Sequence, residues 1–179
     1  MKKAIIHFAT ALIYSAVISV SAAQVAAADF KKFGRAGVWE VSGQQGQCQI
    51  GRSLDAGQMQ FVLSKDGTVI TLQSLSWTKM RQPPSNTFKI TLYLDNKKFV
   101  RTDALVIAQV RAFQIFLLDA SNPKRQRQFW RALAQSKEMA VSVPFQSSRL
   151  RFSVSGIAEA YRLVPKCSQR YLKGVALPF

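Results

Sequence analysis

The stretch "FKITLYLD" at positions 88–95 decides the fold class, because apolar and polar side chains alternate strictly along it. One face of this segment carries Ile90, Leu92 and Leu94, and the other carries a lysine, a threonine and a tyrosine. A period of two is typical of a β-strand that buries one face and exposes the other. The stretch therefore predicts a half-buried strand.

The same alternation recurs along most of the chain. Strands are predicted at 38–42, 58–64, 68–77, 104–110, 112–118, 139–145 and 149–155. Asp66-Gly67 lies between two of these stretches and is a strong hairpin signal. About eight short strands joined by turns predict a mainly β fold, either an antiparallel β-sandwich or a partly open barrel with one or two short helices.

The first predicted helix begins near Asn122, which suits the N-cap, and Pro123, which suits the first helical position. At about 100° per residue, Phe129, Trp130 and Leu133 gather on one side, so we expect them to pack against the sheet. The bases of this helix are predicted to face solvent, with a stripe of Lys124, Arg127 and Arg131 and with Arg125 to the side.

The second predicted helix covers 155–167, turning at Gly156 and ending at Pro165. Its apolar residues are expected to seat it on the core, and it would bring Cys167 back towards Cys48. These are the only cysteines, and in an oxidising compartment a lone pair is most simply a disulfide. A redox-active pair is the alternative, although it usually needs close spacing.

The N-terminus has the layout of a secretory signal peptide. Lys2 and Lys3 precede an apolar run, and Ala26 and Ala28 satisfy the small-residue rule for cleavage before Asp29. We therefore predict a signal peptide at 1–28, a single β-rich domain at 29–179, and a periplasmic or secreted bacterial protein without a membrane span after cleavage. Cleavage after Ala23 and an uncleaved anchor are the alternatives.

Loss of this segment would remove His7, the only histidine of the chain. Ser-His-Asp and Cys-His chemistry would then be excluded, and two cysteines without histidine cannot form an ordinary four-ligand zinc site. The nine acids are scattered and no phosphate-binding glycine loop is present. We predict no enzyme, cofactor or metal site; a histidine-free hydrolase remains the enzymatic alternative.

The formal net charge of +16 becomes +14 without Lys2 and Lys3, and this surplus is the main clue to a partner. The expected partner is an anionic envelope component (lipopolysaccharide, a lipid headgroup or an acidic glycan), a host component or an acidic protein; nucleic acid is not expected. A protein-directed adaptor or inhibitor module is the alternative, and a merely solvated basic surface is a third interpretation. The candidate anion-binding residues are Lys97, Lys98, Arg101, Lys124, Arg125, Arg127 and Arg131.

Two motifs support a resemblance to a known family. "GVWEV" at 37–41 and the closing "FSVSGIAEAYRLVPKC" at 152–167, with strands and a helix between them, resemble the invasion-associated locus B family and related small exported periplasmic proteins. The resemblance covers most of 37–167 in the order of elements. It implies an all-β envelope protein without known catalysis, linked to host contact, and it transfers no catalytic residue.

Overall fold

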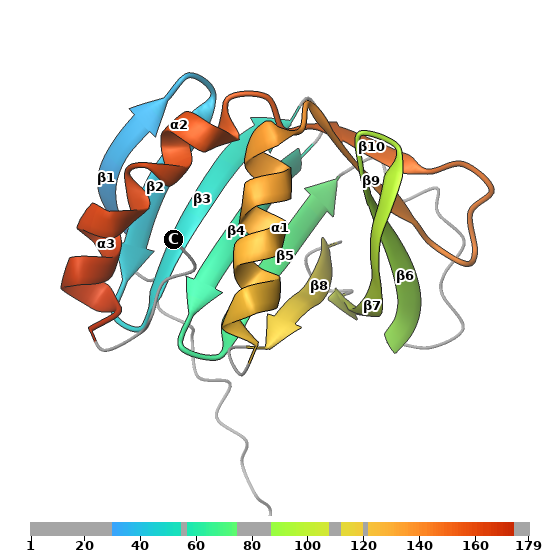
Figure 1. Cartoon of the computed structure of the whole chain (residues 1–179), viewed down its shortest axis with the longest axis horizontal. Coiled ribbons are helices and arrows are strands. Elements are labelled where there is room, and N and C mark those ends of the chain that lie inside the picture. The colour runs from blue at the N-terminus through green and yellow to red at the C-terminus, as the bar shows by residue number, and fades with distance from the viewer. Residues whose placement is uncertain (1–29, 55–56, 75–86, 108–111, 120–121, 174–179) are drawn as a thin grey trace, which may run out of the picture.

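The computed structural model describes residues 30–54, 57–74, 87–107, 112–119 and 122–173, so the predicted signal peptide and the expected new N-terminus at Asp29 lie outside it. Within these ranges the chain forms ten strands and three helices (Figure 1). The strands are β1 (Lys31–Ala36), β2 (Trp39–Gln44), β3 (Gln47–Leu54), β4 (Gly57–Ser64), β5 (Gly67–Ser74), β6 (Thr87–Leu94), β7 (Lys97–Ile107), β8 (Ala112–Asp119), β9 (Glu138–Ser142) and β10 (Leu150–Ser153). The helices are α1 (Pro123–Gln135), α2 (Ile157–Tyr161) and α3 (Val164–Tyr171).

The strands are hydrogen-bonded in the order β1-β2-β3-β4-β5-β8-β7-β6-β9-β10, and neighbouring strands are antiparallel. Figure 1 shows α1 crossing in front of β4 and β5, with β1 to β3 on its left and β6, β7, β9 and β10 on its right. Among the described strands, β1 and β10 are the edges and do not pair with each other, so the sheet bends around its core without closing. The predicted fold class, mainly β with antiparallel strands in a sandwich-like arrangement, is confirmed.

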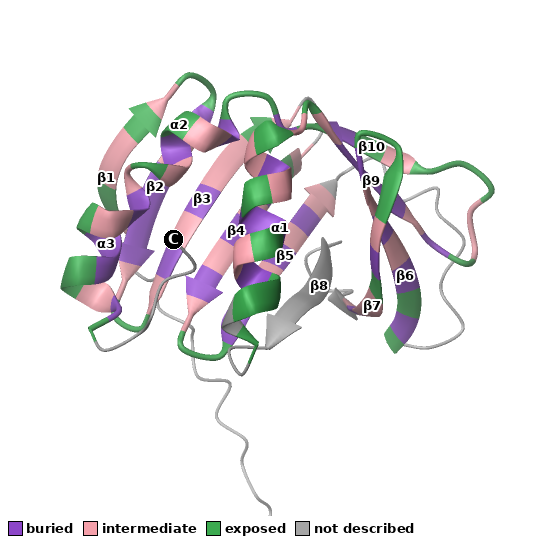
Figure 2. Cartoon of the chain, in the orientation of Figure 1, coloured by how far each residue is buried: buried purple, intermediate pink, exposed green. Residues whose placement is uncertain are grey.

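Helix α1 fills the space between the two halves of the sheet. Figure 2 shows buried and exposed residues following one another along α1. Phe129, Trp130 and Leu133 are among its buried residues, as predicted. The ring of Phe129 lies 6.4 Å from Phe61 of β4 and 5.6 Å from Phe99 of β7, measured between centroids. One face of α1 therefore contacts both halves of the sheet. This contact explains why the helix carries apolar residues along one side.

The start of α1 follows the prediction closely. Asn122 is the N-cap, and its Oδ1 accepts a hydrogen bond of 3.0 Å from the backbone N–H of Arg125. The expected stripe of bases is only partly correct, because Arg127 is half-buried whereas Arg125 is exposed. The exposed bases on α1 are therefore Lys124, Arg125 and Arg131.

Two strands, β1 and β3, were not predicted. β1 carries lysines, an arginine and Gly34 instead of an apolar alternation, and its pairing with β2 is interrupted by an irregularity between Lys32 and Gly34. β3 does alternate at first, with Cys48 and Ile50 buried. It holds too few apolar residues to be recognised, so its extended form comes from pairing with β2 and β4.

The predicted helix over 155–167 is two helices, α2 and α3, and the prediction that Pro165 ends it is wrong. α2 ends at Tyr161, and Pro165 lies in the first turn of α3. A proline has no N–H to donate, and the first turn of a helix is where none is required. Buried Ala160 and Val164 seat the two helices on the core, as expected.

The predicted disulfide is confirmed between Cys48 of β3 and Cys167 of α3, whose Cα atoms are 6.0 Å apart. Both cysteines are fully buried. The bridge requires a glycine beside it, because a Cβ atom at Gly43 would lie 2.3 Å from the sulfur of Cys167. Gly43 is the residue opposite Cys48 in the β2–β3 pairing, so this glycine makes room for α3 to approach the sheet.

Asp95 and Asn96 form the two-residue turn between β6 and β7, and both have positive φ, at 44° and 66°. Two consecutive residues with positive φ are typical of a type I′ hairpin. The Oδ1 of Asp95 also accepts hydrogen bonds from the backbone N–H groups of Lys137 and Glu138, at 2.9 and 3.0 Å. This carboxylate therefore fixes the hairpin to the start of β9.

The pH dependence of stability should report this contact. The backbone hydrogen bond from Glu138 is the main cause that lowers the pKa of Asp95 below its ordinary value of 3.8. Because the folded protein lowers the pKa of Asp95, the ionised carboxylate stabilises the fold at any pH above its ordinary pKa. This stabilisation is lost as the pH falls through the lowered pKa. In thermal melts between pH 7 and pH 2, Asp95→Asn should therefore lose less stability on acidification than the wild type.

Asp95→Gly is the matched control, because glycine keeps the positive φ and removes the acceptor. It should be less stable than the wild type at neutral pH, whereas Asp95→Asn retains an oxygen acceptor there. Acid melting curves that are identical for the wild type and Asp95→Asn would contradict the assignment.

Candidate functional site

The candidate sites among the described residues lie on the surface of the protein. No group of three histidine, cysteine, aspartate or glutamate side chains within the described ranges is arranged to hold a metal ion. None of the described helices has the length and apolar character needed to cross a membrane. The surface features are a group of bases on the outer side of one half of the sheet and a polar groove on the outer side of the other half.

The group of bases lies on the outer face of β6, β7, β9 and β10. Lys98 is opposite Tyr93 and Arg101 is opposite Thr91 in the β6–β7 pairing. Residues directly opposite one another in an antiparallel pair project to the same side of the sheet. Tyr93 and Thr91 alternate with the buried leucines of β6, so both bases project outwards.

Arg149 joins this group from the segment just before β10. Its guanidinium carbon lies 3.7 Å from the centroid of the Tyr93 ring, which is a close cation–π contact. Tyr93 is opposite Ala140 on its other side, and this small residue leaves the ring open to Arg149. We call Lys98, Arg101 and Arg149 the basic face.

The charges of the basic face are uncompensated, in contrast to those of its neighbours. On the same half of the sheet, Lys89 pairs with Asp103 and Arg151 pairs with Glu138. Within the described part of the chain, no ion pair engages any member of the basic face. Three exposed cations on one surface are therefore available to an anion.

The structure does not bring all the predicted anion-binding residues together. Lys97 is opposite buried Leu94, so its side chain leaves the β6–β7 hairpin on the side that faces the core. Lys98, the next residue, projects to the opposite side. The exposed bases of α1 face solvent on the inner side of the sheet, where that helix packs. Lys98 and Arg101 thus remain as one group, and the helical bases Lys124, Arg125, Arg127 and Arg131 belong to another surface.

Arg149 was missed as a site residue, although the sequence held a signal for it. In "RLRFS", at 149–153, the arginines alternate with Leu150 and Phe152. Because those two residues turn towards the core, the two arginines must share the outer face. What the sequence could not give is the strand order that places β10 two strands from β6.

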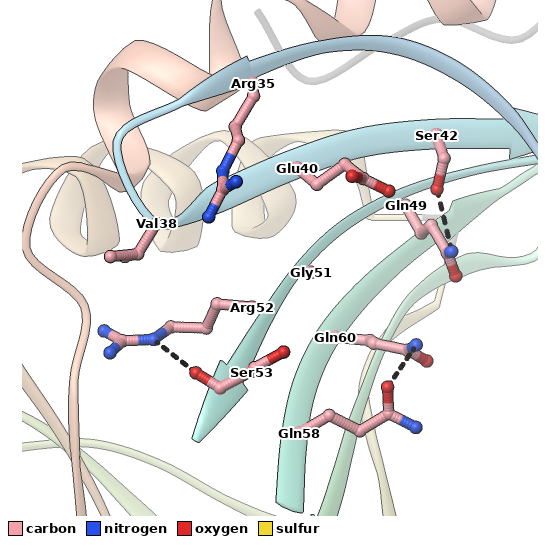
Figure 3. Close-up of a pocket in the computed structure, with 10 residues that line it drawn as sticks. All are labelled: Arg35, Val38, Glu40, Ser42, Gln49, Gly51, Arg52, Ser53, Gln58 and Gln60. Atoms are coloured by element: carbon pink, nitrogen blue, oxygen red, sulfur yellow. Dashed lines mark hydrogen bonds between the residues drawn. The ribbon is translucent and has the colours of Figure 1, made fainter. Parts of the chain in front are cut away.

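The polar groove, which we call the amide groove, crosses the outer face of β2, β3 and β4 (Figure 3) and has a volume of about 290 Å³. Gly51 forms its floor, because a residue without a side chain leaves a hollow among larger neighbours. Arg35 and Arg52 lie at one end. The lining residues are Arg35, Val38, Glu40, Ser42, Gln49, Gly51, Arg52, Ser53, Gln58 and Gln60.

The glutamines of the amide groove are hydrogen-bonded to one another and to a serine. Gln60 donates to the Oε1 of Gln58 at 3.2 Å, and Gln58 donates to the Oε1 of Gln73 at 2.6 Å. Gln49 donates to the hydroxyl of Ser42 at 2.9 Å. These bonds restrict flexible side chains that would otherwise sample many rotamers.

The two arginines of the groove are held by backbone carbonyls. The Nε of Arg35 donates to the carbonyl of Gly37 at 2.9 Å, and Arg52 donates to the carbonyl of Ser153 at 3.0 Å. Arg52 also lies 5.4 Å from the centroid of the buried ring of Trp39. Arg52 therefore joins β3 to the end of β10 and has a clear structural role.

A second hollow of about 690 Å³ adjoins the groove and shares Val38 and Arg52 with it. It lies between the β1–β2 turn and the segment that leads from β10 into α2, and Trp39 and Glu159 are among its lining residues. The indole N–H of Trp39 donates to the carbonyl of Ser155 at 2.9 Å, so this ring fixes the segment in place.

Comparisons with protein-family models, with curated proteins and with solved structures find no match to this chain. The resemblance to the invasion-associated locus B family therefore stays a prediction, carried by the motifs at 37–41 and 152–167.

Proposed function

We propose that the chain is an exported, non-enzymatic binding protein that uses its basic face to hold an anionic component of the bacterial envelope or of a host surface. The observation that carries this proposal is the placement of Lys98, Arg101 and Arg149 on one outer face without acidic partners among the described residues. The signal-like N-terminus at 1–28 and the disulfide support export, since disulfides persist in oxidising compartments.

The distribution of acids supports the same proposal. Glu40, Asp66, Asp103 and Glu138 each form an ion pair with a lysine or arginine. Their charges are therefore cancelled locally, whereas no ion pair among the described residues cancels the charges of Lys98, Arg101 and Arg149. Such a surface attracts anions over about 10 Å at 0.1 M salt, and its attraction weakens as the salt concentration rises.

The chemistry of the basic face fits phosphate groups well. The guanidinium carbon of Arg149 lies 3.7 Å from the centroid of the Tyr93 ring, and this contact restricts the side chain before a ligand arrives. Thr91 and Ser142 are opposite one another on β6 and β9, and their hydroxyls can donate to phosphate oxygens beside Arg101. Arginine donates to phosphate through two parallel N–H groups, which adds geometric selectivity to charge.

We expect the triple variant Lys98→Gln, Arg101→Gln, Arg149→Gln to bind anionic vesicles about a hundredfold more weakly than the wild type. Each basic residue near an anionic membrane contributes about 1 kcal/mol, and 1.4 kcal/mol corresponds to a factor of about ten. The measurement is sedimentation with vesicles of phosphatidylglycerol and of phosphatidylcholine at two salt concentrations. The salt dependence of the variant should be flatter.

The matched control is Lys124→Gln, Arg125→Gln, Arg131→Gln, which removes the same charge from the exposed side of α1. It should retain most of the affinity. Equal losses in both triple variants would show that only total charge matters and would overturn the assignment. An affinity for vesicles that does not change with salt concentration, or a complex with a protein partner that persists at high salt, would favour an adaptor or inhibitor instead.

A further inference from the structure

The outer face of β2 to β5 differs in composition from the rest of this basic protein. Its outward-facing described positions hold neither lysine nor arginine, although the chain has 25 of these residues. Six glutamines occupy this face instead, together with serine and threonine hydroxyls, Val62, Val69 and Glu40, whose carboxylate pairs with Lys32. The outward-facing glutamines are Gln44, Gln47, Gln49, Gln58, Gln60 and Gln73.

From this face we infer a second binding site, in which the amide groove holds an uncharged glycan chain that carries acetamido groups. A primary amide both donates and accepts hydrogen bonds, and so do a sugar hydroxyl and an acetamido group. The neutral amides of the groove suit such a ligand better than an ion, because the charged groups beside them are already engaged, Glu40 by Lys32 and the two arginines by backbone carbonyls. The site is distinct from the basic face and does not depend on the function proposed for it.

Gln49 and Gln60 are placed to read an acetamido group. Gln60 is opposite Gly51 in the β3–β4 pairing, and Gln49 precedes Gly51 by two residues on the same face of β3. Each glutamine uses one N–H in the bonds described above, and the Oε1 of each has no hydrogen-bond partner among the described residues. Each therefore presents an acceptor and a second N–H, which match the N–H and carbonyl of an acetamido group.

The hollow over Gly51 supplies the space between these two amides. A Cβ atom built at Gly51 would lie 3.4 Å from the Cγ of Gln60, which is ordinary contact, so the absence of a side chain here is not required by the backbone. The groove volume of about 290 Å³ lies at the lower end of small-ligand sites, near 300 Å³. We place the acetamido methyl group and part of one sugar ring in this hollow.

The direction of the glycan follows from the sheet. Gly51, Gln60 and Thr71 are successive partners across β3, β4 and β5, so they form a row perpendicular to the strands. Neighbouring strands are about 4.8 Å apart, close to the length of one sugar in an extended β-1,4-linked chain. A glycan lying across the strands would thus meet one strand per sugar.

The two arginines at the end of the groove do not make it an anion site. Arg35 and Arg52 donate to backbone carbonyls, and Glu40 lies among the lining residues with them. Because the ligand is uncharged, its binding should be nearly independent of salt, in contrast to binding at the basic face.

The test is calorimetric titration of the full-length mature protein with chitopentaose, which carries acetamido groups, and with cellopentaose, which has the same linkage without them. We expect chitopentaose to bind measurably and cellopentaose to bind about tenfold more weakly or worse. Absence of chitopentaose binding, equal binding of the two sugars, or a strong decrease with salt would each overturn the inference.

Gly51→Val fills the hollow and should lower the affinity for chitopentaose about tenfold or more while leaving the melting temperature at or above that of the wild type. The double variant Gln49→Ala, Gln60→Ala should have the same effect on affinity, and it tests the site independently if Gly51→Val is poorly folded. Its matched control is Gln44→Ala, Gln47→Ala, on the same face outside the groove, which should bind normally. Unchanged affinity in a folded Gly51→Val or in the Gln49, Gln60 variant would overturn the inference.

Discussion

Trp130→Ala should lower the free energy of unfolding by about 3–5 kcal/mol, the usual range when a fully buried aromatic residue is truncated. Trp130 is 2% exposed and stacks on Tyr161 with ring centroids 4.5 Å apart. It also lies 5.7 Å from Phe61 of β4. Its removal would leave a cavity between the sheet and the helices that cover it, and the melting temperature should fall by about 6–20 °C. Urea denaturation monitored by circular dichroism measures the loss.

Two controls separate packing from other roles of this ring. The indole N–H of Trp130 is buried without a hydrogen-bond partner among the described residues, so Trp130→Phe keeps much of the packing and removes an unsatisfied donor. It should be clearly more stable than Trp130→Ala. The variant Lys124→Gln, Arg125→Gln, Arg131→Gln changes only the exposed side of the same helix and should stay close to the wild type. If Trp130→Ala melted like the wild type, the packing role of α1 would be refuted.

Loss of the disulfide is the second large expected effect, at about 2–5 kcal/mol for the double variant Cys48→Ala, Cys167→Ala. The two cysteines are 119 positions apart, so the bond restricts most of the unfolded chain. In the folded state it fastens α3 to β3. Changing both cysteines avoids leaving a buried thiol without its partner.

The wild type and the double variant are each unfolded and refolded with or without reductant, and their thermal melting curves are then compared. Reductant should lower the melting temperature of the wild type towards that of the double variant and leave the double variant unchanged. Intact mass and thiol titration of protein from a bacterial envelope fraction, purified without reductant, should give no free thiols and a chain that begins at Asp29. Two free thiols per chain in such material would contradict both the bond and the oxidising compartment.

The parts of the fold that the sequence predicted are those in which local pattern and final environment agree. "FKITLYLD" alternates because its inner residues meet a core and its outer residues do not, and β6 follows that pattern. β1 could not be predicted from its own composition, since its extended form depends on β2 beside it and on Leu163, which lies close to Gly34. The division of the last helix was missed for a related reason, because Pro165 is compatible both with ending a helix and with beginning one.

The site was harder to predict than the fold because it depends on which strands become neighbours. Lys98 and Arg101 are close in sequence, but Arg149 reaches Tyr93 only because β9 and β10 follow β6 in the sheet. The amide groove posed the same difficulty, since its glutamines lie on two strands, one of which was not predicted. Charge clusters in the sequence identify residues, and the strand order decides which of them share a surface.

The two edge strands bear on how the protein behaves at high concentration. An open sheet edge can recruit the edge of another molecule and grow into a fibre, which short strands, lysines and irregular pairing oppose. β10 has four residues, and β1 carries Lys31 and Lys32 next to the irregularity at Gly34. Both edges of the ten-stranded sheet are therefore poorly suited to pairing with another molecule, and a substitution that removes the irregularity of β1 should make that edge more prone to aggregate.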